Sequence, residues 1–253
     1  MKLSVDQRIG NVLFVVEGEQ FEVQLLKHIF YTLLDYRTLT RRRRPASGFQ
    51  TYQSQTAHST VYVISAPNSN VASVLSGKDY LDALYSTLYA EYSVNIDNLT
   101  TFFIFDRDNA TNPQPVIDNL LSILQNPQDN DECERGGLLL LSYPSIESYL
   151  LPLCPAVGDG LMNANALKKH LRANRVQPSR ISSDDLLGSY GVLENFITKH
   201  LGIDIESKLE SYGHEVNKPL ESYQSRQLAT NGCYRFVSSL VFALRYLNVI
   251  MPD

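Results

Sequence analysis

Short apolar runs mark the first part of the chain, at residues 12–16, 61–64, 102–105 and 138–141. Their apolar positions are continuous rather than alternating, which is typical of strands covered on both faces, as in a parallel sheet. Between them, apolar residues recur at helical spacing over residues 21–33, 80–92 and 116–124. The pattern predicts a βαβαβαβ order, and hence an α/β fold with a central, mostly parallel sheet of about four strands flanked by helices.

After residue 141 the pattern changes to mostly helical segments, at residues 164–172, 190–201 and 234–247. The loops between them are rich in Pro, Gly, Ser and Asp. We therefore expect an α/β domain over residues 1–154 and a mainly helical C-terminal extension over residues 155–253, packed on the first domain.

Composition narrows the class of protein. With 253 residues, 43% of them hydrophobic, the chain can bury one large core. No apolar run approaches the roughly 20 residues that span a bilayer, and no signal-peptide segment stands at the N-terminus, so we expect a cytoplasmic protein without membrane contact. Cys133, Cys154 and Cys233 have neither C-x-x-C nor paired His spacing, so no disulfide framework or zinc site is indicated.

Acidic residues follow three of the four predicted strands. Glu17 and then Glu22 follow the first, Asp106 and Asp108 end the third, and Glu147 lies shortly after the fourth. Ligands of open α/β sheets bind beyond the carboxyl ends of the strands, so these side chains are expected to share one site. Two carboxylates about 4 Å apart repel by roughly 4 kcal/mol at an effective dielectric constant of 20, so such a cluster needs cations or protons. Oxygen ligands without His or Cys suit Mg²⁺ or Mn²⁺.

Each motif also has a simpler structural interpretation. Glu17, Glu22 and Glu147 could be acidic residues at the start of a helix that do no more than interact favourably with its dipole. Residues 106–109 could form a plain turn. The occurrence of all three motifs at matching strand ends favours a shared site. The run Arg41, Arg42, Arg43 and Arg44 lies in a stretch, residues 37–55, that we expect to be an exposed loop. This run is either solvated or binds a nucleic-acid backbone. The net charge of −5 argues against binding of nucleic acid by the overall charge of the protein, so such binding would need a local basic surface.

Taken together, these residues resemble a known family. Glu17-Gly18 after one strand and Asp106-x-Asp108 after another resemble the Toprim domain shared by topoisomerases, bacterial primases and a set of nucleases. The ordered blocks over residues 17–22, 106–108 and 142–151 are similar to the RloB-like and abortive-infection (overcoming-lysogenization-defect-type) Toprim nucleases. Tyr143 stands where those proteins usually have Asn, and Phe21 where they have a small residue. The resemblance covers about residues 10–152.

The resemblance implies a Toprim-like fold and an Mg²⁺- or Mn²⁺-dependent endonuclease that cleaves DNA or RNA, with tRNA among the candidates, as the effector of an antiviral defence system. Glu17, Asp106 and Asp108 would be catalytic. The implied metal ligands or their supports are Glu17, Glu22, Asp106, Asp108 and Glu147. Arg41 to Arg44 would hold the nucleic acid. The carboxylate that acts as the base is left open.

The implied partners are a nucleic-acid substrate, an ATPase and further copies of the chain. An ATPase would have to be a separate protein, because the chain has no G-x-x-x-x-G-K-[ST] phosphate loop. The alternative function is a Toprim-like binding module that docks on an ATPase partner and is inert or gated on its own. Nucleotide polymerisation, as in primases, is less favoured because the chain is short and has no zinc module.

Overall fold

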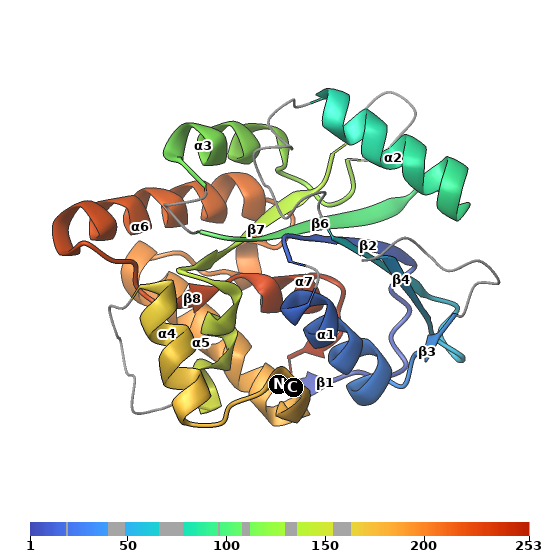
Figure 1. Ribbon diagram of the computed structural model, residues 1–253, viewed down its shortest axis with the longest axis horizontal. Coiled ribbons are helices and arrows are strands. Elements are labelled where there is room, and N and C mark those ends of the chain that lie inside the picture. Colours follow the sequence, from blue (N-terminus) through green and yellow to red (C-terminus); the bar gives the residue numbers. More distant parts are fainter. Residues whose placement is uncertain are drawn as a thin grey trace.

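The computed structural model describes residues 1–18, 20–39, 49–65, 78–95, 97–107, 112–129, 136–153 and 163–252 (Figure 1). Its centre is a seven-stranded sheet in the order β3-β4-β5-β2-β6-β7-β8. The four inner strands are parallel: β5 (Thr60–Ser65), β2 (Asn11–Val16), β6 (Leu99–Asp106) and β7 (Leu138–Tyr143). These are the four strands that the apolar runs predict, and the α/β class is confirmed.

Antiparallel strands extend this sheet on both sides. They are β4 (Phe49–Gln53) and β3 (Arg37–Thr38) beside β5, and β8 (Val237–Ser238) beside β7. The expectation of an exposed loop over residues 37–55 is therefore wrong at both ends of that stretch. The side chains of Phe49 and Tyr52 are buried in the core, which explains why β4 forms there. Residues 40–48 lie outside the described part of the chain.

Helices cover both faces of the sheet (Figure 1). α2 (Lys78–Tyr92) and α3 (Gln114–Ile123) lie on one face. On the other lie α1 (Phe21–Lys27), which continues as the π-helix η1 (His28–Leu33), and α7 (Leu240–Tyr246). Side chains such as Phe14 and Phe102, whose rings stack with centroids 5.5 Å apart, fill the core between these layers.

The C-terminal part is mainly helical, as expected. After the 3₁₀ helix η4 (Ile146–Leu153), it contains α4 (Ala164–Ala173), α5 (Ser183–Leu201), α6 (Lys218–Asn231) and the short helices η6 (Pro178–Arg180), η7 (Glu206–Lys208) and η8 (Gly213–Asn217). The helix expected over residues 234–247 is instead β8 followed by α7. The C-terminal part thus adds a strand to the sheet, and β9 (Ile250–Met251) pairs with β1 (Lys2–Leu3), so the two termini lie together (Figure 1).

Buried residues from both sides of the expected domain boundary belong to one hydrophobic cluster. The division into residues 1–154 and 155–253 stays a prediction. Across the described residues, no helix combines the length and the apolar character that crossing a bilayer requires.

Candidate functional site at the carboxyl ends of the strands

Glu17 and Asp106 are joined at the ends of two neighbouring strands. β2 and β6 are parallel, so their carboxyl ends lie at the same edge of the sheet. Glu17 follows β2 directly, and its Oε2 accepts a hydrogen bond of 2.8 Å from the backbone N–H of Asp106. The Glu17 carboxylate is therefore held at the last residue of β6.

Asp106 in turn connects β6 with the segment after β7. Its Oδ1 accepts a 2.7 Å hydrogen bond from the backbone N–H of Ile146, the first residue of η4. Its carbonyl oxygen accepts a hydrogen bond from the Asn112 side chain. The next residue of η4 is Glu147, so the structure brings the ends of three parallel strands together.

Glu22 lies in the first turn of α1 and is buried, with 8% of its surface exposed. Its carboxylate lies against Gly18, where a side chain in place of the glycine hydrogen would collide with Glu22 Oε2. Burial raises the pKa of Glu22, with backbone hydrogen bonds opposing this rise and the charge of Glu147 adding to it. Glu22 therefore belongs to the same electrostatic neighbourhood as Glu147.

The pKa of Asp106 is raised by its surroundings. Burial raises its pKa well above the usual range, and the charges of Glu147, Glu17 and Glu22 raise it further. Lys168 acts in the opposite direction. The acidic cluster is defined here as Glu17, Glu22, Asp106 and Glu147.

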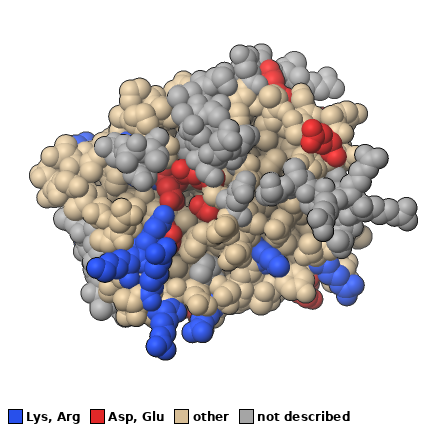
Figure 2. All heavy atoms as spheres, in the orientation of Figure 1, with Lys and Arg blue, Asp and Glu red and all other residues tan. Residues whose placement is uncertain are grey.

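Lys168 on α4 supplies the positive charge beside the cluster. Its Nζ lies 3.6 Å from Glu147 Oε1 and 4.0 Å from Asp106 Oδ2. Burial lowers the pKa of Lys168, but the charges of Glu147, Asp106 and Glu22 outweigh this effect and raise it. Figure 2 shows acidic side chains in a hollow, with Lys and Arg side chains over α4 along one side.

The sequence did not single out Lys168. The signal in the sequence is the spacing of Leu167 and Leu171, four residues apart, which marks one apolar stripe of a helix. Both leucines are buried in the structure, and position 168 lies beside their stripe.

The oxygen atoms of the acidic cluster suit a hard divalent cation in chemical type. Glu147 Oε2 is buried and has no hydrogen-bond partner among the described residues, so a cation there would satisfy it. As they stand, however, no three Asp, Glu, His or Cys side chains of the described segments form a group that could hold a metal ion. Metal ligation by this cluster stays a prediction. Asp108 and Arg41 to Arg44 lie outside the described residues.

A buried polar network lies behind the cluster. The Arg107 side chain is fully buried, and its Nε forms a 3.0 Å ion pair with Glu221 Oε1 on α6. Its other nitrogens donate to Asn112 O at 2.7 Å and to Gln114 Oε1 at 2.6 Å, and Tyr143 donates to Glu221 Oε2. This network ties the segment after Asp106 to the C-terminal part of the chain.

Comparison of the chain with protein-family models, with curated proteins and with solved structures finds no match.

Proposed function

We propose that the acidic cluster is the active centre of an Mg²⁺- or Mn²⁺-dependent nuclease that cleaves phosphodiester bonds. The observation that carries the proposal is the meeting of Glu17, Asp106 and Glu147 from three strand ends beside Lys168. The pKa values of Asp106 and Glu22 are raised, and carboxyl groups with raised pKa values at the edge where α/β proteins bind ligands are a frequent mark of a functional site.

The cluster needs a cation to approach a phosphate, since carboxylates and phosphates repel each other. Glu17, Asp106 and Glu147 would hold the ion, with Glu22 supporting them. A bound Mg²⁺ or Mn²⁺ would supply Lewis acidity and a water of lowered pKa. The backbone N–H groups of Asp106 and Ile146 hold the Glu17 and Asp106 carboxylates at the strand ends, and the side chains of the cluster would turn toward the ion on binding.

Basic side chains beside the cluster support a phosphate-containing substrate. A pocket of about 110 Å³ adjoins the acidic cluster, and Glu147, Lys168 and Arg172 are among the residues that line it. An ammonium and a guanidinium at such a pocket can bind phosphate oxygens. The resemblance to RloB-like and abortive-infection Toprim proteins supports a role as an antiviral effector.

A cleavage assay tests the proposal. The purified full chain with Mg²⁺ or Mn²⁺ should cut plasmid DNA, single-stranded DNA or tRNA. Glu17→Gln and Asp106→Asn should each reduce the rate at least about 100-fold, because each removes a charge that the ion requires. Asp82→Asn, on the exposed surface of α2, is the matched control and should cut at the wild-type rate.

Thermal unfolding must show that the variants are folded. Undiminished cleavage by folded Glu17→Gln and Asp106→Asn proteins would refute the proposal. Cleavage that appears only when an ATPase partner is added would assign the same chemistry to a gated enzyme. A cellular function that persists in both variants would identify a docking module instead.

A further inference from the structure

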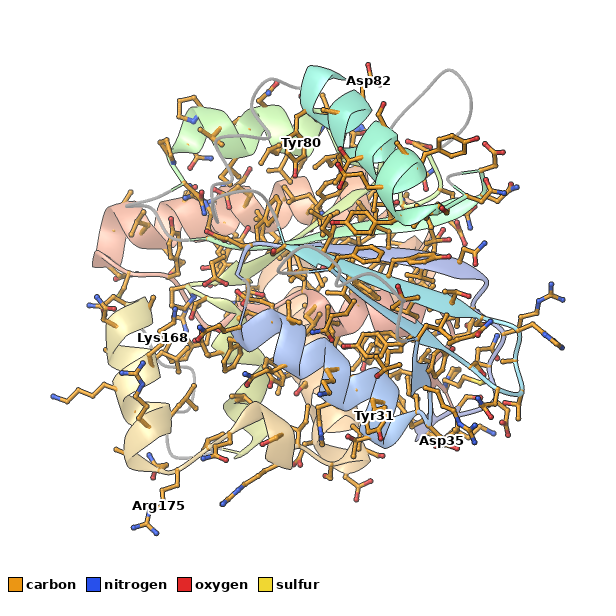
Figure 3. The ribbon with its side chains drawn as sticks, turned by 45° about the vertical axis from the view of Figure 1, so that its right-hand side comes forward. Tyr31, Asp35, Tyr80, Asp82, Lys168 and Arg175 are labelled. Carbon is orange, nitrogen blue, oxygen red and sulfur yellow. The ribbon has the colours of Figure 1, made fainter. Side chains whose placement is uncertain are left out.

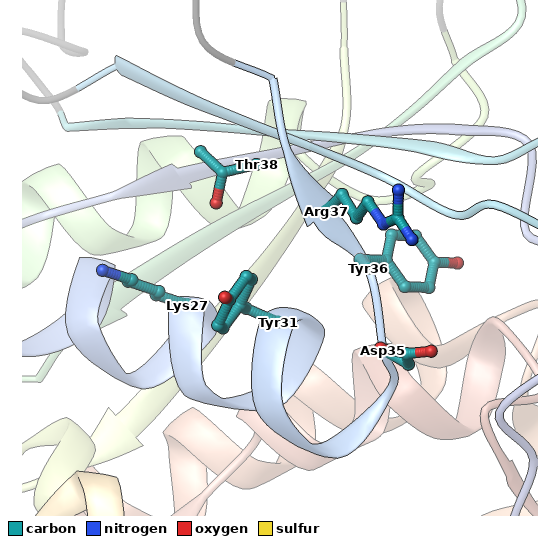
Figure 4. A pocket seen from close by; sticks show the side chains of 6 residues that line it. All are labelled: Lys27, Tyr31, Asp35, Tyr36, Arg37 and Thr38. Carbon is teal, nitrogen blue, oxygen red and sulfur yellow. The ribbon is translucent and has the colours of Figure 1, made fainter.

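A second pocket lies at the far end of the helix that begins with the acidic cluster. It has a volume of about 620 Å³ and opens between η1 and β3 (Figure 4). The residues that line it are Lys27, Tyr31, Asp35, Tyr36, Arg37 and Thr38. This volume lies within the range of pockets that bind small organic groups, which is about 300–1,000 Å³.

The pocket combines an open aromatic ring with positive charge. Tyr31 is 51% exposed, and Lys27 stands one turn before it on the same helix (Figure 4). Arg37 stands on the neighbouring strand β3, with its side chain directed away from Lys27 and Tyr31 (Figure 4). In the described part of the chain, neither Lys27 nor Arg37 is paired with a carboxylate. Aromatic faces beside basic side chains are what proteins use to bind single-stranded nucleic acid.

The remaining lining residues limit what the pocket can bind. Tyr36 is buried, with its ring packed edge-on against Phe30 at 5.5 Å between centroids, so it forms part of a rigid wall. Asp35 adds one acidic side chain to the lining. The pocket therefore suits one phosphate and one base rather than a run of phosphates.

The helix connects this pocket with the acidic cluster. Glu22 lies in the first turn of α1, and Tyr31 follows nine residues later, about 14 Å along the axis at 1.5 Å per residue. A nucleic-acid strand with helically stacked bases spans that distance with about four nucleotides, at 3.4 Å each. Figure 3 shows the helix running from the side of Lys168 to Tyr31 and Asp35. Tyr31 also lies in a π-helical turn, a feature that is frequent at functional sites.

We propose that this pocket is a nucleotide subsite for a single-stranded nucleic acid, in which a base stacks on Tyr31 and its phosphate meets Lys27. The inference rests on the proposed function, because it places a strand that enters the acidic cluster a few nucleotides away. The pocket then fixes the register of the strand relative to the site of cleavage.

Fluorescence anisotropy with labelled 12-nucleotide DNA and RNA strands tests the subsite, in EDTA so that no cleavage occurs. Tyr31→Ala should weaken binding about tenfold, and Tyr31→Phe should restore it, because stacking needs only the ring. Lys27→Gln should reduce the slope of log K against log salt concentration by about 0.7, because one phosphate contact is lost. The controls are Tyr89→Ala, an aromatic residue 68% exposed on α2, and Arg226→Gln, exposed on α6; both should bind like the wild type.

The subsite is refuted if folded Tyr31→Ala binds both strands like the wild type, or if the wild type binds neither strand. It is also refuted if binding of heparin, a polyanion without bases, depends equally on Tyr31, or if a free mononucleotide binds as tightly as the strand. Tyr31-dependent binding without any cleavage would refute the nuclease and retain the subsite. Cleavage together with binding that does not depend on Tyr31 would refute the subsite and retain the nuclease.

Discussion

Asp106 is the residue on which the electrostatics of the cluster depend most. Its side chain is 16% exposed at the end of a central strand, and burial of the rest together with the charges of three other acids raises its pKa. A protein without a use for such charges would gain stability by removing one of them. The arrangement is therefore better explained by ligand binding than by folding.

This gives a stability test without a substrate. Because the pKa of Asp106 is raised in the folded state, its contribution to stability is fully present below the unfolded pKa and is lost as the pH rises through the folded pKa. In EDTA, Asp106→Asn should therefore unfold at a higher urea concentration than the wild type at pH 8, and this difference should shrink toward pH 4. An equal or lower stability of the variant at pH 8 would contradict the proposed repulsion.

Some residues of the candidate site could be predicted from the sequence and others could not, for a physical reason. Glu17, Asp106 and Glu147 follow strands that could be recognised, and parallel strands bring their ends to one edge. Lys168 and the Arg107 partner Glu221 lie on helices whose position depends on tertiary packing. No local pattern in the sequence contains that information.

Among the elements, α6 and the end of β6 are joined by a buried ion pair. Arg107 and Glu221 are 0% and 3% exposed, and each has further hydrogen bonds. Such a pair holds two elements in one relative position, although it adds little net stability compared with apolar residues. Here it fixes the backbone that follows Asp106.

Removing one partner of this ion pair should destabilise the fold far more than replacing both partners with apolar residues. Arg107→Met leaves the Glu221 charge buried without its partner, so the free energy of unfolding should fall by about 3–5 kcal/mol. Arg107→Met combined with Glu221→Met should recover much of that loss. Guanidinium unfolding of both proteins measures the effect. A loss below about 1 kcal/mol in the single variant would show that the pair does not hold the two elements.

The inner strands were predictable and the outer ones were not. β2, β6 and β7 are buried on both faces or nearly so, and their continuous apolar runs indicate this directly. β5 is buried on one face and partly buried on the other, and its apolar run is still sufficient to predict a strand. β3 and β8 have only two residues each, too few to show a period. They form because a neighbouring strand offers hydrogen bonds.

At the scale of the whole molecule, the candidate site is built from both parts of the chain. The carboxylates come from the strand ends, whereas Lys168 comes from α4 and the partner of Arg107 from α6. The overall charge is −5, so the basic side chains beside the cluster and at the Tyr31 pocket give the molecule a polarised surface rather than a basic one. Substrate binding should accordingly depend on these local surfaces and on the metal ion.

The central claim is that the acidic cluster binds a divalent cation, and Mn²⁺ binding followed by electron paramagnetic resonance tests it most directly. The wild type should bind Mn²⁺, and Mg²⁺ should compete. A concentration of 100 times the Kd should stabilise the fold by about 2.7 kcal/mol. Glu17→Gln and Asp106→Asn should weaken binding at least about tenfold, and Asp82→Asn should not. Equal Mn²⁺ affinity in all four proteins, or no binding by the wild type, would contradict the account.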